Sequence, residues 1–225
     1  MKKTLAVFLA AAISVLSFAG CGSSTTASSA APASQAAVSS AATSSAAAAS
    51  GTVKTGLGIV SSLASSTPVK DGKGTAVADV TAVAVTVGSD GKILKCSIDG
   101  LRAQIEFSDK GKLLTPETTV FKSKNELGEA YGVKKASKIG KEWNEQAEAF
   151  AKYVVGKTAD EVKGIAVSSE GKATASELTA SVTIHVGDFI TAVQKAVNNA
   201  QDLGAKADDK LGLGIESSGA QSADA

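Results

Sequence analysis

The 225-residue sequence contains one histidine and two cysteines, and this scarcity excludes several kinds of catalytic site. His185 alone cannot form a multi-histidine metal site, and it leaves few ways to activate a serine or cysteine nucleophile. Cys96 is the only cysteine after Cys21, so the mature domain has no disulfide framework and no cysteine metal site. HExxH, GxSxG and paired-carboxylate motifs are also absent from the sequence. These absences argue against an autonomous hydrolase.

The sequence also lacks an excess of charge of either sign. Without Lys2 and Lys3, 21 of the 23 basic residues remain against 22 acidic ones. A nearly neutral domain has no electrostatic reason to bind nucleic acid or an anionic membrane surface. We therefore expect no nucleic acid among its partners.

The longest apolar run lies at the N-terminus and is too short to span a membrane. MKKTLAVFLAAAISVLSFAG has two early lysines, about fourteen apolar residues and small residues before Cys21, which is the pattern of an export signal over residues 1–20. A membrane-spanning helix needs about twenty apolar residues. The sequence FAGC that ends at Cys21 resembles the lipobox of bacterial lipoproteins, although leucine is usual at the position of Phe18. That resemblance implies a diacylglyceryl anchor on Cys21, which places the protein on the extracytoplasmic face of the cell membrane.

Residues 21–50 have the composition of a flexible tether. From Gly22 to Ser50 every residue is Gly, Ser, Thr, Ala, Pro, Gln or Val, and the first charge after Lys3 is Lys54. Such a segment buries too little apolar surface to offset the entropy lost on ordering. A coil of this length has ends on the order of 30 Å apart, enough to hold a domain clear of the membrane.

Strand patterns dominate the first half of the remaining chain. The β-branched run Ala76–Val87, the turn sequence Gly88–Lys92 and the apolar run Ile93–Phe107 predict a long antiparallel hairpin. In the second arm the apolar residues change from even to odd positions at Asp99 and Gly100, which predicts a β-bulge there.

Apolar residues at helical spacing follow in the second half. They predict helices over Gly140–Val155 and Val186–Gln201, with Trp143 in the core of the domain. A shorter helix is expected to start at Thr158 and end at Gly164, and a brief strand is expected over Ile165–Ser168.

One nine-residue sequence occurs twice. KTGLGIVSS covers Lys54–Ser62 and KLGLGIESS covers Lys210–Ser218, with seven of nine positions identical. Leu and Ile alternating around glycines predict a strand that another backbone approaches closely. We expect both copies to be strands of one sheet, or the second to be the opening strand of a lost repeat. The predicted fold over residues 51–218 is therefore α+β, a mainly antiparallel sheet of the hairpin and both GLGI strands with helices packed against it, followed by a disordered tail over 219–225.

The stretch Glu177–Val197 carries a resemblance to a known family. ELTASVT ends at Thr183 and precedes a predicted helix that contains an Ala-Val pair, while the hairpin contains DGKI at Asp90–Ile93. This pattern resembles the FMN-binding domains of exported bacterial flavoproteins and lipoproteins. In that family an acidic residue precedes a Ser-Gly-Ala-Thr run whose threonine carries FMN through a phosphoester bond. The resemblance implies FMN as cofactor and electron transfer to a redox partner as function, with Thr183 at the attachment position.

Two interpretations of Thr183 remain open. Ala180, Ser181 and Val182 stand where the family has Ser, Gly and Ala, and the β-branched Val182 is stiff. Either FMN is bound at Thr183, or the hydroxyl of Ser181 or Thr183 caps the start of the last helix. A non-covalent FMN site would combine the start of this helix with a lysine-rich segment. Its expected residues are Ser181, Thr183, His185, Lys134 and Lys135. The predicted function is a membrane-anchored FMN-binding-like module, and the alternative is a cell-surface binding or structural module that has lost the cofactor.

Overall fold

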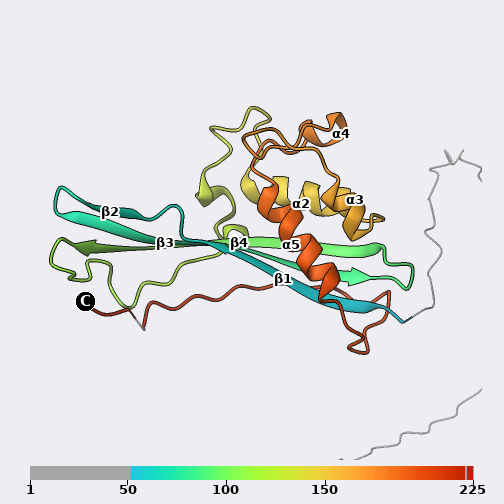
Figure 1. Cartoon of the computed structure of the whole chain (residues 1–225), viewed down its shortest axis with the longest axis horizontal. Coiled ribbons are helices and arrows are strands. Elements are labelled where there is room, and N and C mark those ends of the chain that lie inside the picture. The colour runs from blue at the N-terminus through green and yellow to red at the C-terminus, as the bar shows by residue number, and fades with distance from the viewer. Residues whose placement is uncertain (1–51, 221, 225) are drawn as a thin grey trace, which may run out of the picture. The chain divides into compact units, whose positions relative to one another are not determined.

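The computed structural model describes residues 52–220 and 222–224, which form an α+β fold (Figure 1). Four antiparallel strands make one sheet, namely β1 (Lys54–Ser62), β2 (Thr67–Lys70), β3 (Lys73–Val87) and β4 (Ile93–Ser108). The central strand is β3, which pairs with β4 along its whole length and with β1 and then β2 along its other edge. The predicted fold class and the predicted long hairpin are confirmed.

The predicted β-bulge at Asp99 and Gly100 is wrong. Pairing between β3 and β4 runs without a shift through Ala82–Asp99 and Thr81–Gly100, and the irregularity lies at Thr86 and Val87 instead. The apolar positions change parity because the two halves of β4 are covered on opposite faces. Ile98 packs under the helices, whereas Ile105 lies beside Leu113, Phe121 and Gly219 on the other face.

Five α-helices and one 3-10 helix follow the sheet, and they gather over one of its faces (Figure 1). They are α1 (Lys124–Leu127), η1 (Gly128–Tyr131), α2 (Trp143–Val154), α3 (Ala159–Lys163), α4 (Ser176–Thr179) and α5 (Gly187–Asn198). The three predicted helices correspond to α2, α3 and α5. The brief strand expected over Ile165–Ser168 is reduced to one isolated bridge between Val167 and Ala173. Trp143 is buried, as predicted, in the core that α2 and α5 form with the sheet.

The glycines of β1 allow α5 to lie directly on the strand. A Cβ added at Gly56 would stand 1.9 Å from the carbonyl oxygen of Ala196, and one at Gly58 would stand 2.0 Å from that of Ala192. Both distances are far inside van der Waals contact, so a side chain at either position would push the helix away. The predicted close approach of another backbone is therefore confirmed, and the approaching backbone is a helix.

The second GLGI copy is not a strand, which corrects the prediction of a C-terminal strand in the sheet. Residues 210–218 form no ladder and run along the side of the sheet opposite the helices (Figure 1). Both outer edges of the sheet are already occupied in part. Leu114 and Thr115 donate their N–H groups to Glu106 of β4, and Lys195 and Asn199 of α5 donate side-chain N–H groups to carbonyls of β1.

The C-terminal segment nevertheless stays on the domain beyond Ser218. Its odd-numbered residues from Leu211 to Ser217 are partly buried, Gly219 is buried, and the even-numbered residues are exposed. Ser217 Oγ donates to the carbonyl of Phe121 at 2.8 Å, and Asp224 Oδ1 accepts the N–H of Leu113 at 2.6 Å. In residues 219, 220 and 222–224 the structure thus differs from the expected disordered tail.

The predicted signal peptide, the lipidated Cys21 and the tether over 21–50 lie outside the described residues. Within the described part of the chain, no helix combines the length and the apolar character needed to cross a membrane. Membrane attachment through Cys21 stays a prediction.

Candidate functional site

A groove of about 560 Å³ opens between the helix-covered face of the sheet and the helices α1, η1, α2 and α5. Small-molecule sites commonly have volumes of roughly 300–1,000 Å³. Two other cavities, of about 260 Å³ and 250 Å³, fall below that range. The groove combines three aromatic side chains with charged ones, and its chemically informative residues are Asp79, Arg102, Lys124, Tyr131, Trp143, His185, Asp188 and Phe189.

The aromatic side chains form a connected wall. Trp143, the first residue of α2, packs edge-on against Phe189 in the first turn of α5, with ring centroids 5.6 Å apart and planes at 85°. Tyr131, at the end of η1, meets Trp143 at 6.4 Å and 71°. Edge-to-face pairs of this kind stabilise one another beyond their burial, so the wall is a fixed apolar surface.

Lys124 places a positive charge against this wall. Its Nζ lies 5.1 Å from the centroid of Tyr131 and 4.9 Å from that of Trp143, within cation–π distance of both rings. The preceding Ser123 fixes the start of α1 through a capping box, because its hydroxyl accepts the Glu126 N–H while the Glu126 carboxylate accepts the Ser123 N–H. Within the described residues Lys124 forms no ion pair, so it can attract an anionic group of a ligand.

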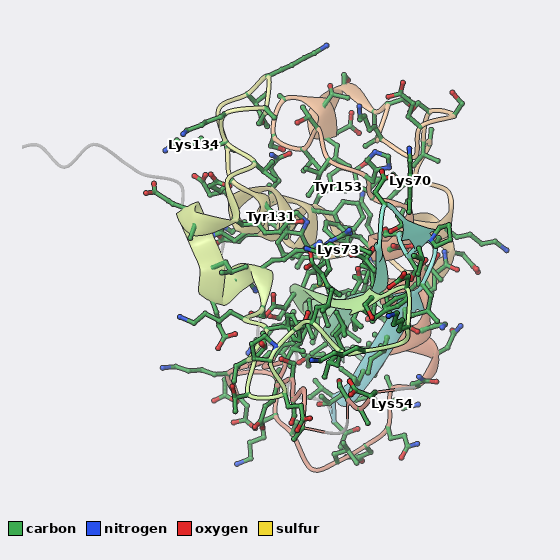
Figure 2. All side chains as sticks on the ribbon, turned by 90° about the vertical axis from the view of Figure 1, so that its left-hand side faces the viewer. Lys54, Lys70, Lys73, Tyr131, Lys134 and Tyr153 are labelled. Atoms are coloured by element: carbon green, nitrogen blue, oxygen red, sulfur yellow. The ribbon has the colours of Figure 1, made fainter. Side chains whose placement is uncertain are left out.

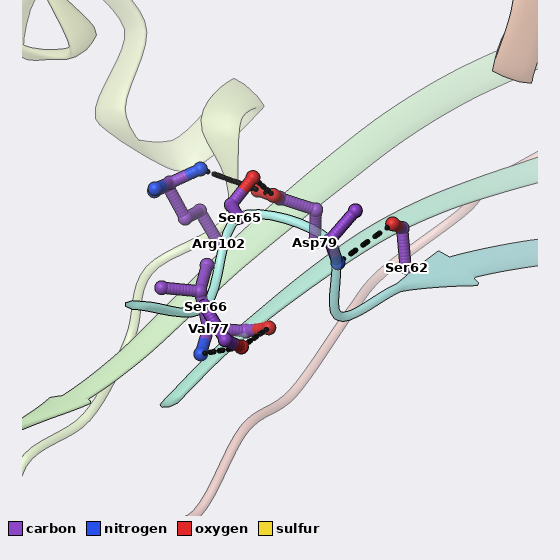
Figure 3. A network of polar contacts seen from close by, with 7 residues as sticks. Ser62, Ser65, Ser66, Val77, Asp79 and Arg102 are labelled. Carbon is purple, nitrogen blue, oxygen red and sulfur yellow. Dashed lines mark hydrogen bonds and ion pairs between the residues drawn. The ribbon is translucent and has the colours of Figure 1, made fainter. Parts of the chain in front are cut away.

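Arg102 and Asp79 form an ion pair at the sheet side of the groove (Figure 3). The two residues are opposite one another on β4 and β3, and Arg102 Nη1 lies 3.0 Å from each carboxylate oxygen of Asp79. Ser65 donates a further hydrogen bond of 2.7 Å to the same carboxylate. This network holds the guanidinium in place and offsets part of its charge, leaving Lys124 as the stronger attractor for an anion.

His185 enters the groove from the segment that leads into α5. Its backbone forms an isolated bridge with Lys172, and Asp188 follows in the first turn of the helix. The residue before α5 is Val186, and its apolar side chain cannot accept a hydrogen bond from the first N–H groups of the helix. The first N–H groups of α5 add a partial positive charge near the His185 end of the groove, and the carboxylate of Asp188 offsets it.

Thr183 lies in a different place, at the cavity of about 250 Å³ that Lys138, Lys172 and Val182 also line. Gln146, a fully buried residue of α2, accepts hydrogen bonds from the Thr183 N–H at 2.8 Å and from its hydroxyl at 3.2 Å. The hydroxyl of Ser181 instead donates to the carbonyl of Leu178. Neither residue caps α5, so the helix-cap interpretation is wrong, and the reason is that the helix begins four residues after Thr183.

The five sequence-predicted site residues do not share one cavity. His185 lines the groove, and Thr183 lines the smaller cavity. Lys134 lies on the periphery of the domain (Figure 2), where its Nζ is 3.4 Å from Oε1 of Glu129, and Lys135 is exposed. The lysines that border Thr183 are Lys138 and Lys172. The groove residues that sequence reasoning missed come from segments between Ser62 and Phe189, and no local motif joins them.

Other kinds of site find little support in the described part of the chain. Burial raises the pKa of the Cys96 thiol to about 12, so the thiol stays protonated and poorly nucleophilic at neutral pH. In residues 52–220 and 222–224, no three His, Cys, Asp or Glu side chains gather to hold a metal ion. Comparisons of the chain with protein-family models, curated proteins and solved structures find no match. A functional assignment therefore depends on the chemistry of the groove and on the family resemblance.

Proposed function

We propose that this chain is a lipid-anchored extracytoplasmic binding module of the FMN-binding type, and that it holds FMN non-covalently in the groove. The observation that carries this proposal is the position of Lys124, a cation without a carboxylate partner among the described residues, against an aromatic wall. FMN joins a flat, largely apolar ring system to a phosphate group. A groove with an apolar wall, one free cation and a volume of about 560 Å³ suits such a ligand.

The charges around the groove support a defined orientation of the ligand. The phosphate would pair with Lys124 and approach Arg102, because phosphate oxygens prefer charge-assisted hydrogen bonds from lysine and arginine. The ring system would lie against Tyr131, the partly exposed residue of the aromatic wall, because Trp143 and Phe189 behind it are only 6% and 3% exposed. His185 would offer a hydrogen-bonding group at the α5 end. A bound flavin would make the module an electron carrier.

The surroundings of Thr183 favour non-covalent over covalent binding. Its hydroxyl is engaged by Gln146, and the neighbouring Val182 is buried, so the approach to the hydroxyl is narrower than the family's Ser-Gly-Ala sequence would leave it. The alternative function, a binding or structural module without cofactor, is favoured by the same departures and by the Asp79 carboxylate that offsets Arg102.

Calorimetric titration of the mature protein with FMN and with riboflavin tests the proposal. We expect one FMN per chain, bound at least about tenfold more tightly than riboflavin, since tenfold corresponds to about 1.4 kcal/mol and a charged hydrogen bond contributes that much. Lys124→Met should remove this preference for FMN and leave riboflavin binding unchanged. The matched control is Lys134→Met, which alters an exposed lysine outside the groove. Absence of FMN binding at millimolar concentration, or equal FMN affinity in wild type and Lys124→Met, would contradict the proposal.

A further inference from the structure

The second GLGI copy contains two glycines, Gly212 and Gly214, that its position in the structure does not require. An added Cβ at Gly212 or Gly214 meets no atom within 4 Å, and neither residue has a left-handed φ. Both residues are exposed. Glycine in an extended segment costs about 0.5–1 kcal/mol relative to alanine because it loses more conformational freedom. These two residues therefore match no requirement of the position that the segment occupies.

The same two glycines match the requirements of β1. Gly212 and Gly214 correspond to Gly56 and Gly58, which admit the carbonyls of α5. Leu213 and Ile215 correspond to Leu57 and Ile59, which are about half exposed on the far face of β1 (48% and 49%). The glycines that let α5 lie on β1, and the Leu and Ile that alternate with them, are thus repeated in Lys210–Ser218.

The second copy matches β1 in its starting level along the sheet and in its direction. The side chain of Lys95 donates to the carbonyl of Asp209, and Lys95 lies in the same cross-strand row as Thr86 and Thr55. The second copy therefore starts level with the start of β1, and it runs along the sheet in the same direction (Figure 1).

The chain connection also permits the replacement. Gln201, just after α5, forms an antiparallel bridge with Thr55, with hydrogen bonds of 2.9 Å and 3.0 Å. Leu211 is the counterpart of Thr55 in the second copy. If Leu211 stood there, Gln201 would bridge it across the loop 202–210, which already contains a turn at Gly204 with a φ of 80°. Such a connection is longer than the usual hairpin loop of about 2–5 residues but shorter than the roughly 12–15 residues beyond which loops without secondary structure are uncommon.

We infer that the edge of β3 beside α5 has two alternative occupants in one chain, β1 and Lys210–Ser218, and that the second segment replaces β1 when β1 is removed or damaged. One of the two differences between the copies explains which one is the resting occupant. Val60 packs against the hydrophobic core, whereas its counterpart Glu216 carries a charge. Placing a carboxylate next to the core disfavours the second copy, so β1 holds the edge in the resting structure.

A double-mutant cycle on the two equivalent glycines of the mature protein tests this inference. Gly214→Val alone should not lower the melting temperature, because the added side chain points into open space. Gly58→Val alone should lower the melting temperature by less than about 5 °C, because the second copy takes over the edge. The double variant should lose more than about 10 °C, since neither segment then fits under α5. Glu216→Val added to Gly58→Val should restore part of the small loss.

The same variants give the results that would overturn the inference. Gly58→Val alone could be as unstable as the double variant, in which case the second copy does not replace β1. A double variant as stable as wild type would show that the edge does not require glycine. The melting temperature of Gly58→Val should also be independent of protein concentration, and the variant should elute as the wild type does in size-exclusion chromatography. A new dimer in that variant would contradict replacement within one chain.

Discussion

At the scale of single residues, Gln146 connects α2 to the turn that leads into α5. Its side-chain oxygen accepts the N–H groups of Thr183 and Ile184 and the hydroxyl of Thr183, and its amide nitrogen donates to the carbonyl of Lys141 at 2.9 Å. The sequence indicates that Thr183 makes a specific polar interaction, but it does not indicate that Gln146 is the partner. Gln146 lies 37 positions away, and periodicity carries no information about such a pairing.

We expect Gln146→Ala to lower the free energy of unfolding by about 2–3 kcal/mol, because it leaves two partly buried N–H groups and one hydroxyl without their acceptor. Urea unfolding of the variant and wild type measures this difference. Gln104→Ala is the control, since Gln104 is exposed on β4 and its loss should stay within about 0.5 kcal/mol. Equal losses in both variants would show that the Gln146 network does not stabilise the fold.

At the scale of elements, the residues that alternate along strands and repeat along helices made the hairpin, α2, α3 and α5 predictable. The GLGI sequence also indicated a close backbone approach at Gly56 and Gly58, although a helix rather than a strand approaches there. The predicted bulge and the C-terminal strand were wrong for a common reason. Which face of β4 is covered, and which edge of the sheet is free, depend on segments far along the chain such as 113–121 and 195–199.

Deletion of residues 209–225 should destabilise the domain, even though this segment forms no ladder. It uncovers the face of the sheet on which Leu211, Leu213 and Ile215 are partly buried. At about 25 cal/mol per Å² of apolar surface, a loss of roughly 1–3 kcal/mol is expected, measured as a shift of the urea midpoint. Gly212→Ala, at an exposed position of the same segment, is the control and should not lower the urea midpoint. An unchanged midpoint in the truncated protein would mean that the segment contributes nothing to the resting fold.

At the scale of the whole molecule, composition predicts an exported chain, a polar tether and one α+β domain, and the described residues confirm the fold of that domain. The groove could not be predicted in the same way. Its cation, its ion pair and its aromatic wall come from β3, β4, α1, η1, α2 and α5, so only the tertiary fold brings them together. Of the five predicted site residues, His185 alone lines the groove.

The lipid anchor is tested on the intact protein in its own host. Cys21→Ser should abolish acylation, because the hydroxyl does not receive the diacylglyceryl group, and should leave the protein either uncleaved at the membrane or released by another peptidase. Intact-mass analysis of both proteins measures the difference. The control is Cys96→Ser, which changes the other cysteine and should leave the acylated mass pattern intact. An unacylated wild-type protein whose N-terminus is not Cys21 would contradict membrane anchoring.

The central claim, that FMN occupies the groove, is tested most directly through Trp143, the only tryptophan in the chain and a residue of the groove wall. Addition of FMN to the mature protein should quench the Trp143 emission in a saturable way, with one FMN per chain at the end point. In Lys124→Met the same curve should move to at least about tenfold higher FMN concentration, as expected for the loss of one charged contact. Quenching that rises without saturation, and equally in wild type and Lys124→Met, would contradict an FMN site in the groove.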